Sequence, residues 1–399
     1  MRNKKLQGLL GCENGKSKVR NASYKRRKKK MLIALFSAVG VIFAVVVIIL
    51  INSPGKLEPL KNEQGNVIQG SVSEKIWVDI NGIKQGMFIR GENIQNPVIL
   101  YLHGGPGTPM LQFISYLEQL EKTNERLEKY FTVCYWDQRG AGMTYSKSAD
   151  SATMTVAQMV EDTHEVTEYL KSRFNQEKIY LLGHSWGSYL GVKTIEKYPE
   201  NYLAYIGIGQ VTNQTESERL AYDYMLSHAK DIGDKDVIER LKKYDPYADD
   251  FPTLEYLVKG RTDAMIKYGV GHLHQGLPEG MTFNGMVFRA LFRFKGYTLS
   301  EKINWFLGAD FSMVQLFPII LEDDLFTSSA KFEIPFYIVQ GDYDYQVSRI
   351  LAEKYLDILE APYKEFIAFS NSAHSPNLEE SEKFIEVFCK IATENPLKK

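Results

Sequence analysis

IYLLGHSWGS, residues 179–188, joins a strand signal to a sharp turn and the start of a helix. Ile179–Leu182 is a short apolar run typical of a buried strand, and a helical pattern covers Trp186–Lys197. Between them, GHSWG matches Gly-x-Ser-x-Gly, in which a serine occupies a strained turn and glycines let the strand and helix backbones approach closely. Because the match has the strand–turn–helix context that this chemistry requires, we predict that Ser185 is a nucleophile.

Similar apolar runs recur on both sides of this motif. They lie at Val98–Leu102, Phe131–Trp136, Tyr205–Ile208, Pro335–Val339 and Glu365–Phe369, after a hairpin of Lys75–Ile80 and Ile83–Ile89 with an Asn81-Gly82 turn. Helical patterns such as Val156–Phe174 separate the runs. This alternation predicts an α/β fold with a mainly parallel, doubly wound sheet, built from residues 71–210 and 331–399.

Residues 211–330 interrupt this alternation. Strand-like runs vanish there, and amphipathic stretches at Glu216–Asp231, Val237–Tyr244 and Leu299–Phe306 are broken by prolines, among them Pro318. The pattern predicts a mostly helical insertion that sits over the carboxyl ends of the strands as a cap.

A serine nucleophile needs a base that is itself oriented by an acid. In a fold with this kind of turn, the chain order is serine, acid, histidine. His374 lies in the loop after the last predicted strand, and we expect it to be the base. The acid should follow the strand Pro335–Val339, where both Asp342 and Asp344 are available. The residues alone leave that choice open.

A glycine-rich loop, HGGPG at residues 103–107, follows the strand Val98–Leu102. Its backbone N–H groups would lie where a tetrahedral oxyanion forms, and the N–H of Trp186 would be the second donor.

The N-terminus predicts a membrane anchor. Residues 31–51 carry no charge and would span about 31 Å as a helix, the thickness of a bilayer core. The basic cluster Lys25–Lys30 precedes them, so the positive-inside rule keeps residues 1–30 in the cytoplasm and puts the rest outside. A cleaved signal peptide is the alternative, but its apolar region is usually only about 7–15 residues long. We therefore expect a single-pass signal anchor in the cell membrane, followed by a linker at residues 52–70.

Composition excludes several classes of protein. Residues 1–30 hold 12 of the 48 basic residues and one of the 49 acidic ones, so the remainder is acidic and a nucleic-acid partner is not expected.

The cysteines, Cys12, Cys134 and Cys389, form no paired motif, and Cys134 is expected to be a buried apolar residue. His272 and His274 lack an evident third ligand, so no metal is expected. No cofactor is expected either.

Taken together, HGGPG, DQRGAG at residues 137–142 and GHSWGS resemble the prolyl iminopeptidase family of α/β-hydrolases. The resemblance covers about residues 76–209 and 334–391. It implies an α/β-hydrolase fold with a helical cap, and it puts the family's acid on Asp344 and its histidine on His374. The first two glycines of HGGPG, Gly104 and Gly105, would help to line the oxyanion hole, and we expect Gly105 to supply the donor. Family members hold the substrate's α-ammonium with cap glutamates. The cap glutamates that we considered, none of which aligns residue by residue with that motif, are Glu216, Glu218, Glu255 and Glu322.

The leading functional hypothesis is a membrane-anchored serine aminopeptidase that acts on short peptides through an acyl-enzyme. The alternative is a carboxylic ester hydrolase with the same residues. A carboxylate pair in the cap would favour the first, and a wholly apolar pocket the second. A non-catalytic binding protein on a hydrolase fold is a remote third, because Ser185, Asp344 and His374 are all present.

Overall fold

The computed structural model describes residues 26, 28–37, 39–41, 43–44, 46–121, 125–276 and 280–397. Contacts divide the chain into two units, Met1–Asn52 and Ser53–Lys399. The first unit contains the helix Lys28–Ile51, which is long and apolar enough to cross a membrane. The basic tail predicted for residues 1–30 lies almost entirely outside the described residues.

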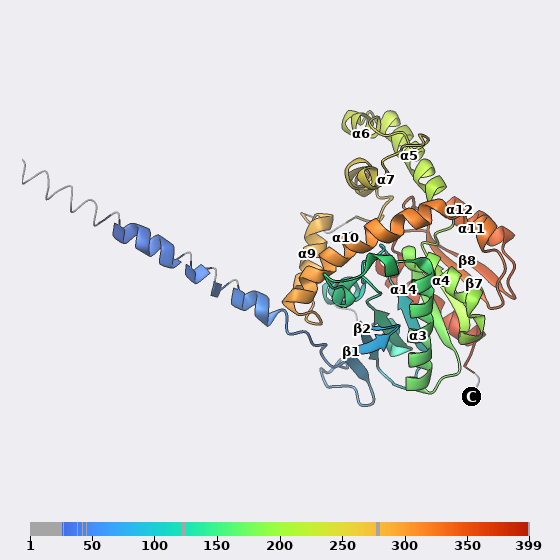
Figure 1. The fold of residues 1–399 in the computed structure, drawn as a ribbon, viewed down its shortest axis with the longest axis horizontal. Helices are drawn as coiled ribbons and strands as arrows, with labels where there is room; N and C mark the ends of the chain where they lie inside the picture. Colours follow the sequence, from blue (N-terminus) through green and yellow to red (C-terminus); the bar gives the residue numbers. More distant parts are fainter. Residues whose placement is uncertain are drawn as a thin grey trace, which may run out of the picture. The chain divides into compact units, whose positions relative to one another are not determined.

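The second unit is built on an eight-stranded sheet with the order β1-β2-β4-β3-β5-β6-β7-β8. Figure 1 labels β1 and β2 from one edge of this sheet and β7 and β8 from the other. β1 and β2 form the predicted hairpin, and β2 is also antiparallel to β4. Strands β4, β3, β5, β6, β7 and β8 run parallel. The strands are β1 Val72–Ile80, β2 Ile83–Gly91, β3 Val98–Leu102, β4 Thr132–Trp136, β5 Ile179–His184, β6 Tyr202–Ile208, β7 Phe336–Gly341 and β8 Lys364–Phe369. The predicted fold class is therefore confirmed.

Helices cover both faces of the sheet because strand side chains alternate between them. Leu100 packs in one apolar cluster with Val166 and Leu190, whereas its neighbour Tyr101 packs in the other with Phe388. The first cluster includes residues of α3 Val156–Phe174, α4 Trp186–Lys197 and α12 Arg349–Ile358, and the second includes residues of α2 Leu111–Glu121 and α14 Ser381–Glu394. Cys134 is fully buried in the first cluster, as expected.

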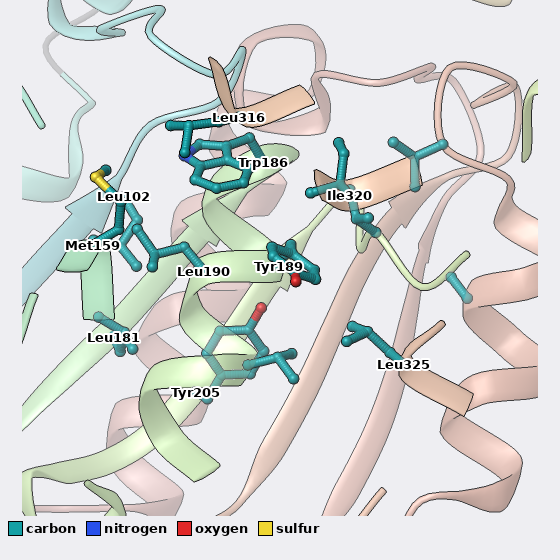
Figure 2. Close-up of a cluster of buried hydrophobic side chains, with 14 of the residues drawn as sticks. Leu102, Met159, Leu181, Trp186, Tyr189, Leu190, Tyr205, Leu316, Ile320 and Leu325 are labelled. Carbon is teal, nitrogen blue, oxygen red and sulfur yellow. The ribbon is translucent and has the colours of Figure 1, made fainter. Parts of the chain in front are cut away.

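Helix α4 connects the sheet to residues that come much later in the chain. Figure 2 shows Trp186 and Tyr189 of α4 among sheet residues such as Leu102 and residues of the 211–330 segment such as Leu316 and Ile320. Helix α4, which begins directly after Ser185, therefore packs in one apolar cluster with side chains of the sheet and of residues 211–330.

Between β6 and β7, the described residues of 211–330 form helices and no strand of the sheet. We call residues 211–330 the helical segment. Its helices are α5 Gln214–Asp231, α6 Lys235–Leu241, α7 Thr253–Glu255, the π-helix η5 Tyr256–Arg261, α8 Thr262–Tyr268, α9 Phe283–Arg293, α10 Leu299–Glu322 and α11 Leu325–Ser328. The prediction that Pro318 breaks the helix was wrong, because α10 continues through it. Proline removes one helical hydrogen bond, but burial of Leu316, Phe317 and Ile320 beside it favours the helix.

The linker predicted at residues 52–70 does not form as expected, because residues 53–70 belong to the second unit and pack within it. Pro54 forms a β-bridge with Thr298, and Lys61 forms one with Val67. Leu60 is buried. Burial of Leu60 stabilises the position of this segment, so residues 53–70 are not a free spacer.

Candidate active site

Ser185 lies in the predicted turn between β5 and α4. Its backbone has φ 55° and ψ −120°, a region that side-chain-bearing residues rarely adopt. A Cβ on Gly183 would collide with the carbonyl of Gly187, and a Cβ on Gly187 would collide with the carbonyl of Leu102. The Ser185 N–H donates to the carbonyl of Ile208 on β6 at 2.8 Å. Packing and hydrogen bonding therefore hold the strained serine at the carboxyl edge of the sheet.

His374 and Asp344 meet at the same edge, from the loops after β8 and β7. His374 Nδ1 lies 2.8 Å from Asp344 Oδ2, and the two residues are 1% and 2% exposed. Asp344 also accepts hydrogen bonds from Gln340 Nε2 at 2.7 Å and from the Val347 N–H at 2.9 Å. A carboxylate at Nδ1 favours the proton on that nitrogen, which leaves Nε2 unprotonated in the neutral ring. Among the described residues, Nε2 has no hydrogen-bond partner.

Asp342, the alternative acid, faces elsewhere. Its carboxylate pairs with Arg349 at 3.1 Å, and its side chain is 37% exposed. The geometry therefore brings Asp344, and not Asp342, to His374.

The glycine loop after β3 lies against the serine turn. A Cβ on Gly104 would lie 3.0 Å from Ser185 Cβ, and the Thr108 N–H closes the loop onto the Gly104 carbonyl at 3.0 Å. Gly105 has φ 111° and lines the same cavity as Ser185. Trp186 is the first residue of α4, where a backbone N–H has no acceptor within its own helix. The two predicted oxyanion donors thus belong to segments that flank Ser185.

Two further histidines are buried close to this edge. Burial, reinforced by the neighbouring His374, lowers the pKa of His184 to about 3. Burial lowers the pKa of His103 to about 4, although a hydrogen bond to the Gly104 carbonyl opposes the shift. His184 Nε2 lies 2.9 Å from the backbone oxygen of His374, so its ring positions the histidine loop. Both rings are neutral at pH 7.

A cavity of about 350 Å³ opens on Ser185 and His374. Its walls are mainly apolar and come largely from the helical segment, with Met265, Phe283, Met286, Trp305, Met313 and Phe317 among them. His272 also lines it, whereas His274 stacks on Tyr343 with 3.4 Å between ring centroids. The helical segment therefore shapes the space in which a substrate would contact Ser185.

One polar cluster interrupts the apolar walls. Gln214 and Arg261 line the cavity, and both contact Glu218, which is 1% exposed. Glu218 Oε1 accepts from Gln214 Nε2 at 2.8 Å and lies 2.9 Å from Arg261 Nη1. Burial raises the pKa of Glu218, and the Arg261 charge opposes that shift. Its Oε2 has no hydrogen-bond partner among the described residues.

The other three glutamates that we considered differ from Glu218. Glu216 is partly exposed and pairs with Arg219, and Glu255 is exposed and pairs with Lys259. Glu322 is exposed at the end of α10. Of the four, Glu218 alone is a buried carboxylate beside the cavity.

Sequence reasoning missed Gln340 and Arg261. Gln340 is the one amide side chain in the buried strand β7, and an amide in an apolar and aromatic run could have been noticed. Arg261 lies 43 positions after Glu218, and no local pattern connects the two.

Comparisons with known proteins agree with this architecture. Residues 97–247 match the family model described as alpha/beta hydrolase fold. A protein of Bacillus subtilis named "Probable aminopeptidase YbaC" is 31% identical over 318 residues, which are 79% of this chain and 95% of that protein. A proline iminopeptidase of Saccharolobus solfataricus is 26% identical over 298 residues, 73% of this chain and 83% of that one.

Solved structures share the fold. The proline iminopeptidase-related protein of Thermus thermophilus has a TM-score of 0.54 at 19% identity, over 81% of this chain and 98% of that one. The proline iminopeptidase of Mycobacterium smegmatis has a TM-score of 0.53 at 15% identity, over 80% and 98%. This chain belongs to the α/β-hydrolase family and is a hydrolase. Within that family it resembles the proline iminopeptidases.

Proposed function

We propose that this protein is a serine hydrolase in which Ser185, His374 and Asp344 form the catalytic triad. The observation that carries the proposal is the Asp344–His374 hydrogen bond, with the free Nε2 and the strained Ser185 lining one cavity. In the first step Ser185 Oγ attacks the substrate carbonyl while His374 Nε2 accepts the hydroxyl proton. Asp344 stabilises the imidazolium that forms.

The tetrahedral oxyanion would be bound by the backbone N–H groups of Gly105 and Trp186. Its collapse breaks the bond to the leaving group, which takes the proton from His374 and departs as an amine or alcohol. The acyl-enzyme that remains is hydrolysed by a water molecule that His374 deprotonates. This second cycle returns the free acid and the Ser185 hydroxyl.

For the substrate class we propose an aminopeptidase of short peptides. The names of the relatives support it, and so does the buried Glu218, whose free Oε2 could accept a hydrogen bond from a substrate α-ammonium. The mainly apolar walls favour the second candidate, a carboxylic ester hydrolase. The complete triad weighs against a binding protein without activity.

We also propose that residues 31–51 anchor the protein in the cell membrane, with 1–30 in the cytoplasm and the hydrolase outside. The apolar length of the helix and the basic cluster before it support this topology. Protease added to intact cells should digest the hydrolase and leave an N-terminal tag intact. Release of the hydrolase by cleavage near Asn52 would contradict an uncleaved anchor.

The test of the chemistry is labelling of the full chain with a fluorophosphonate probe. The wild type should be labelled and Ser185→Ala should not, with Ser188→Ala as a control for the neighbouring hydroxyl. Equal labelling of Ser185→Ala would refute the nucleophile. Comparing aminoacyl amides with acyl esters as substrates for the wild type then separates peptidase from esterase.

A further inference from the structure

Helices α9 and α10 together expose an unusual apolar surface. The residues of this surface, which we call the α9–α10 patch, are Phe288, Phe292, Leu299, Ile303, Phe306 and Leu307, with exposed fractions of 38–63%. The Phe288 and Phe306 rings lie 5.4 Å apart between centroids, so the two helices contribute to one continuous patch. They also lie side by side in Figure 1. Contiguous exposed apolar surface of this kind usually marks an interaction site.

The patch is not part of the core or of the substrate cavity. Other side chains of the same helices, such as Met286 and Val287 of α9 and Trp305 and Phe317 of α10, line the cavity. Helix α10 is apolar enough to pass as a membrane span by length and composition, although part of it is buried in the fold. A surface helix normally has a polar outer face. The outer face of α10 therefore has exposed apolar side chains that packing among the described residues does not explain.

The connectivity of the chain places the start of α10 close to the end of the predicted anchor. The predicted anchor ends at Ile51, and Pro54 already forms a β-bridge with Thr298, immediately before α10. The Lys56 N–H then donates to the carbonyl of Lys295, just after α9. Three residue steps span at most about 11 Å. If the anchor is in a bilayer, the start of the α9–α10 patch must be held close to the lipid headgroups.

Charges around the patch also suit a lipid surface. Arg289 and Arg293 are exposed on α9 beside the phenylalanines, and Lys56 is exposed where the chain leaves the bridge. Lys295 is also basic and pairs with Glu58. These bases stand out because residues 31–399 are acidic as a whole. An apolar surface edged by arginine and lysine is typical of protein segments that lie in the interface of anionic membranes.

We propose that the α9–α10 patch docks on the bilayer surface next to the anchor, with its apolar side chains about 5–10 Å into the headgroup boundary. The proposal rests on the proposed membrane anchor. Docking of this kind would hold the hydrolase in one orientation, with two walls of its cavity at the lipid interface.

The test is nitroxide scanning of the full chain reconstituted in vesicles of phosphatidylcholine and phosphatidylglycerol. Cys12 and Cys389 are first replaced by serine, whereas buried Cys134 is kept. Single cysteines for labelling are then introduced by Phe288→Cys and Ile303→Cys in the patch, Val41→Cys in the anchor and Ile358→Cys as an exposed control at the end of α12. Retained fluorophosphonate labelling shows that each variant is folded.

Labels at 288 and 303 should be accessible to oxygen and protected from a water-soluble nickel complex, as the label at 41 is. The label at 358 should show the opposite preference. If 288 and 303 behave like 358 while 41 lies in lipid, docking is wrong and the anchor stands. If 41 is open to the nickel complex, the anchor itself is wrong. Dipolar broadening between copies at 303 would instead identify the patch as a dimer interface and overturn lipid docking.

Discussion

The carboxyl edge of the sheet and the helical segment form their parts of the site in different ways. At the sheet edge, Ser185, Asp344 and His374 each follow a strand within a few residues, and backbone hydrogen bonds hold the loops. In the helical segment, Glu218 and Arg261 meet only because α5 packs near the end of η5. The sheet edge therefore holds the residues that we propose as the catalytic triad, and the helical segment supplies most of the walls of the cavity beside them. Variants in the two regions should differ accordingly.

The largest effect among these variants is expected for Asp344→Asn at the sheet edge. An uncharged amide does not fix the ring in the tautomer with the proton on Nδ1, and it does not stabilise the imidazolium. We therefore expect kcat to fall by about 10⁴. Melting curves should show a folded enzyme, and kcat is then measured on the best substrate of the wild type. A loss below tenfold would mean that another group orients His374.

In the helical segment, Glu218→Gln should weaken recognition and leave the chemistry intact. If Glu218 holds a substrate ammonium, KM for aminoacyl amides should rise by about 10–100-fold, because a charge-assisted hydrogen bond contributes about 1.5–3 kcal/mol. KM for acyl esters should change little. Glu216→Gln, which removes a partly exposed carboxylate from the same helix, is the matched control. Equal effects on both substrate classes would show that Glu218 is only structural.

Acid should destabilise the fold through the buried histidines at the sheet edge. His184 and His103 have pKa values of about 3 and about 4 in the folded protein, against 6.5 ordinarily. The unfolded chain therefore binds more protons below pH 6.5, and stability present above that pH is lost as pH falls toward 4. Each histidine contributes about 1.4 kcal/mol per pH unit to this slope.

Urea unfolding at pH 7 and pH 5 checks that slope in the wild type and in His184→Gln. The variant should lose less stability than the wild type over this interval, whatever its stability at pH 7. An unchanged difference between the two pH values would show that His184 does not contribute.

The smallest effect is expected for Asp342→Asn, which tests the alternative acid. The exposed ion pair with Arg349 contributes about 0–1 kcal/mol, so both the melting temperature and kcat should stay close to wild type. A dead Asp342→Asn variant would move the catalytic acid by two residues and contradict the geometry described above.

Several elements could be predicted from the residues because their signals are local. Val98–Leu102, Val156–Phe174 and Trp186–Lys197 begin and end as predicted. Each has an apolar period or a turn residue that acts within its own segment. Prediction failed where distant packing outweighs a local signal. Helix α10 runs through Pro318, and residues 53–70 pack within the second unit instead of forming a free linker.

For the site, the same physical distinction applies. The strained turn at Ser185 and the glycine loop before it follow from backbone geometry that only certain residues allow, so a short motif suffices to locate them. The local sequence did not distinguish Asp342 from Asp344 as the acid. In the folded chain, only Asp344 of the two is hydrogen-bonded to Gln340, Val347 and His374. The pairing of Glu218 with Arg261 and the exposure of the α9–α10 patch depend on which helix faces meet. The exposed fraction of a side chain depends on which other elements pack against it, so the sequence of one segment does not determine it.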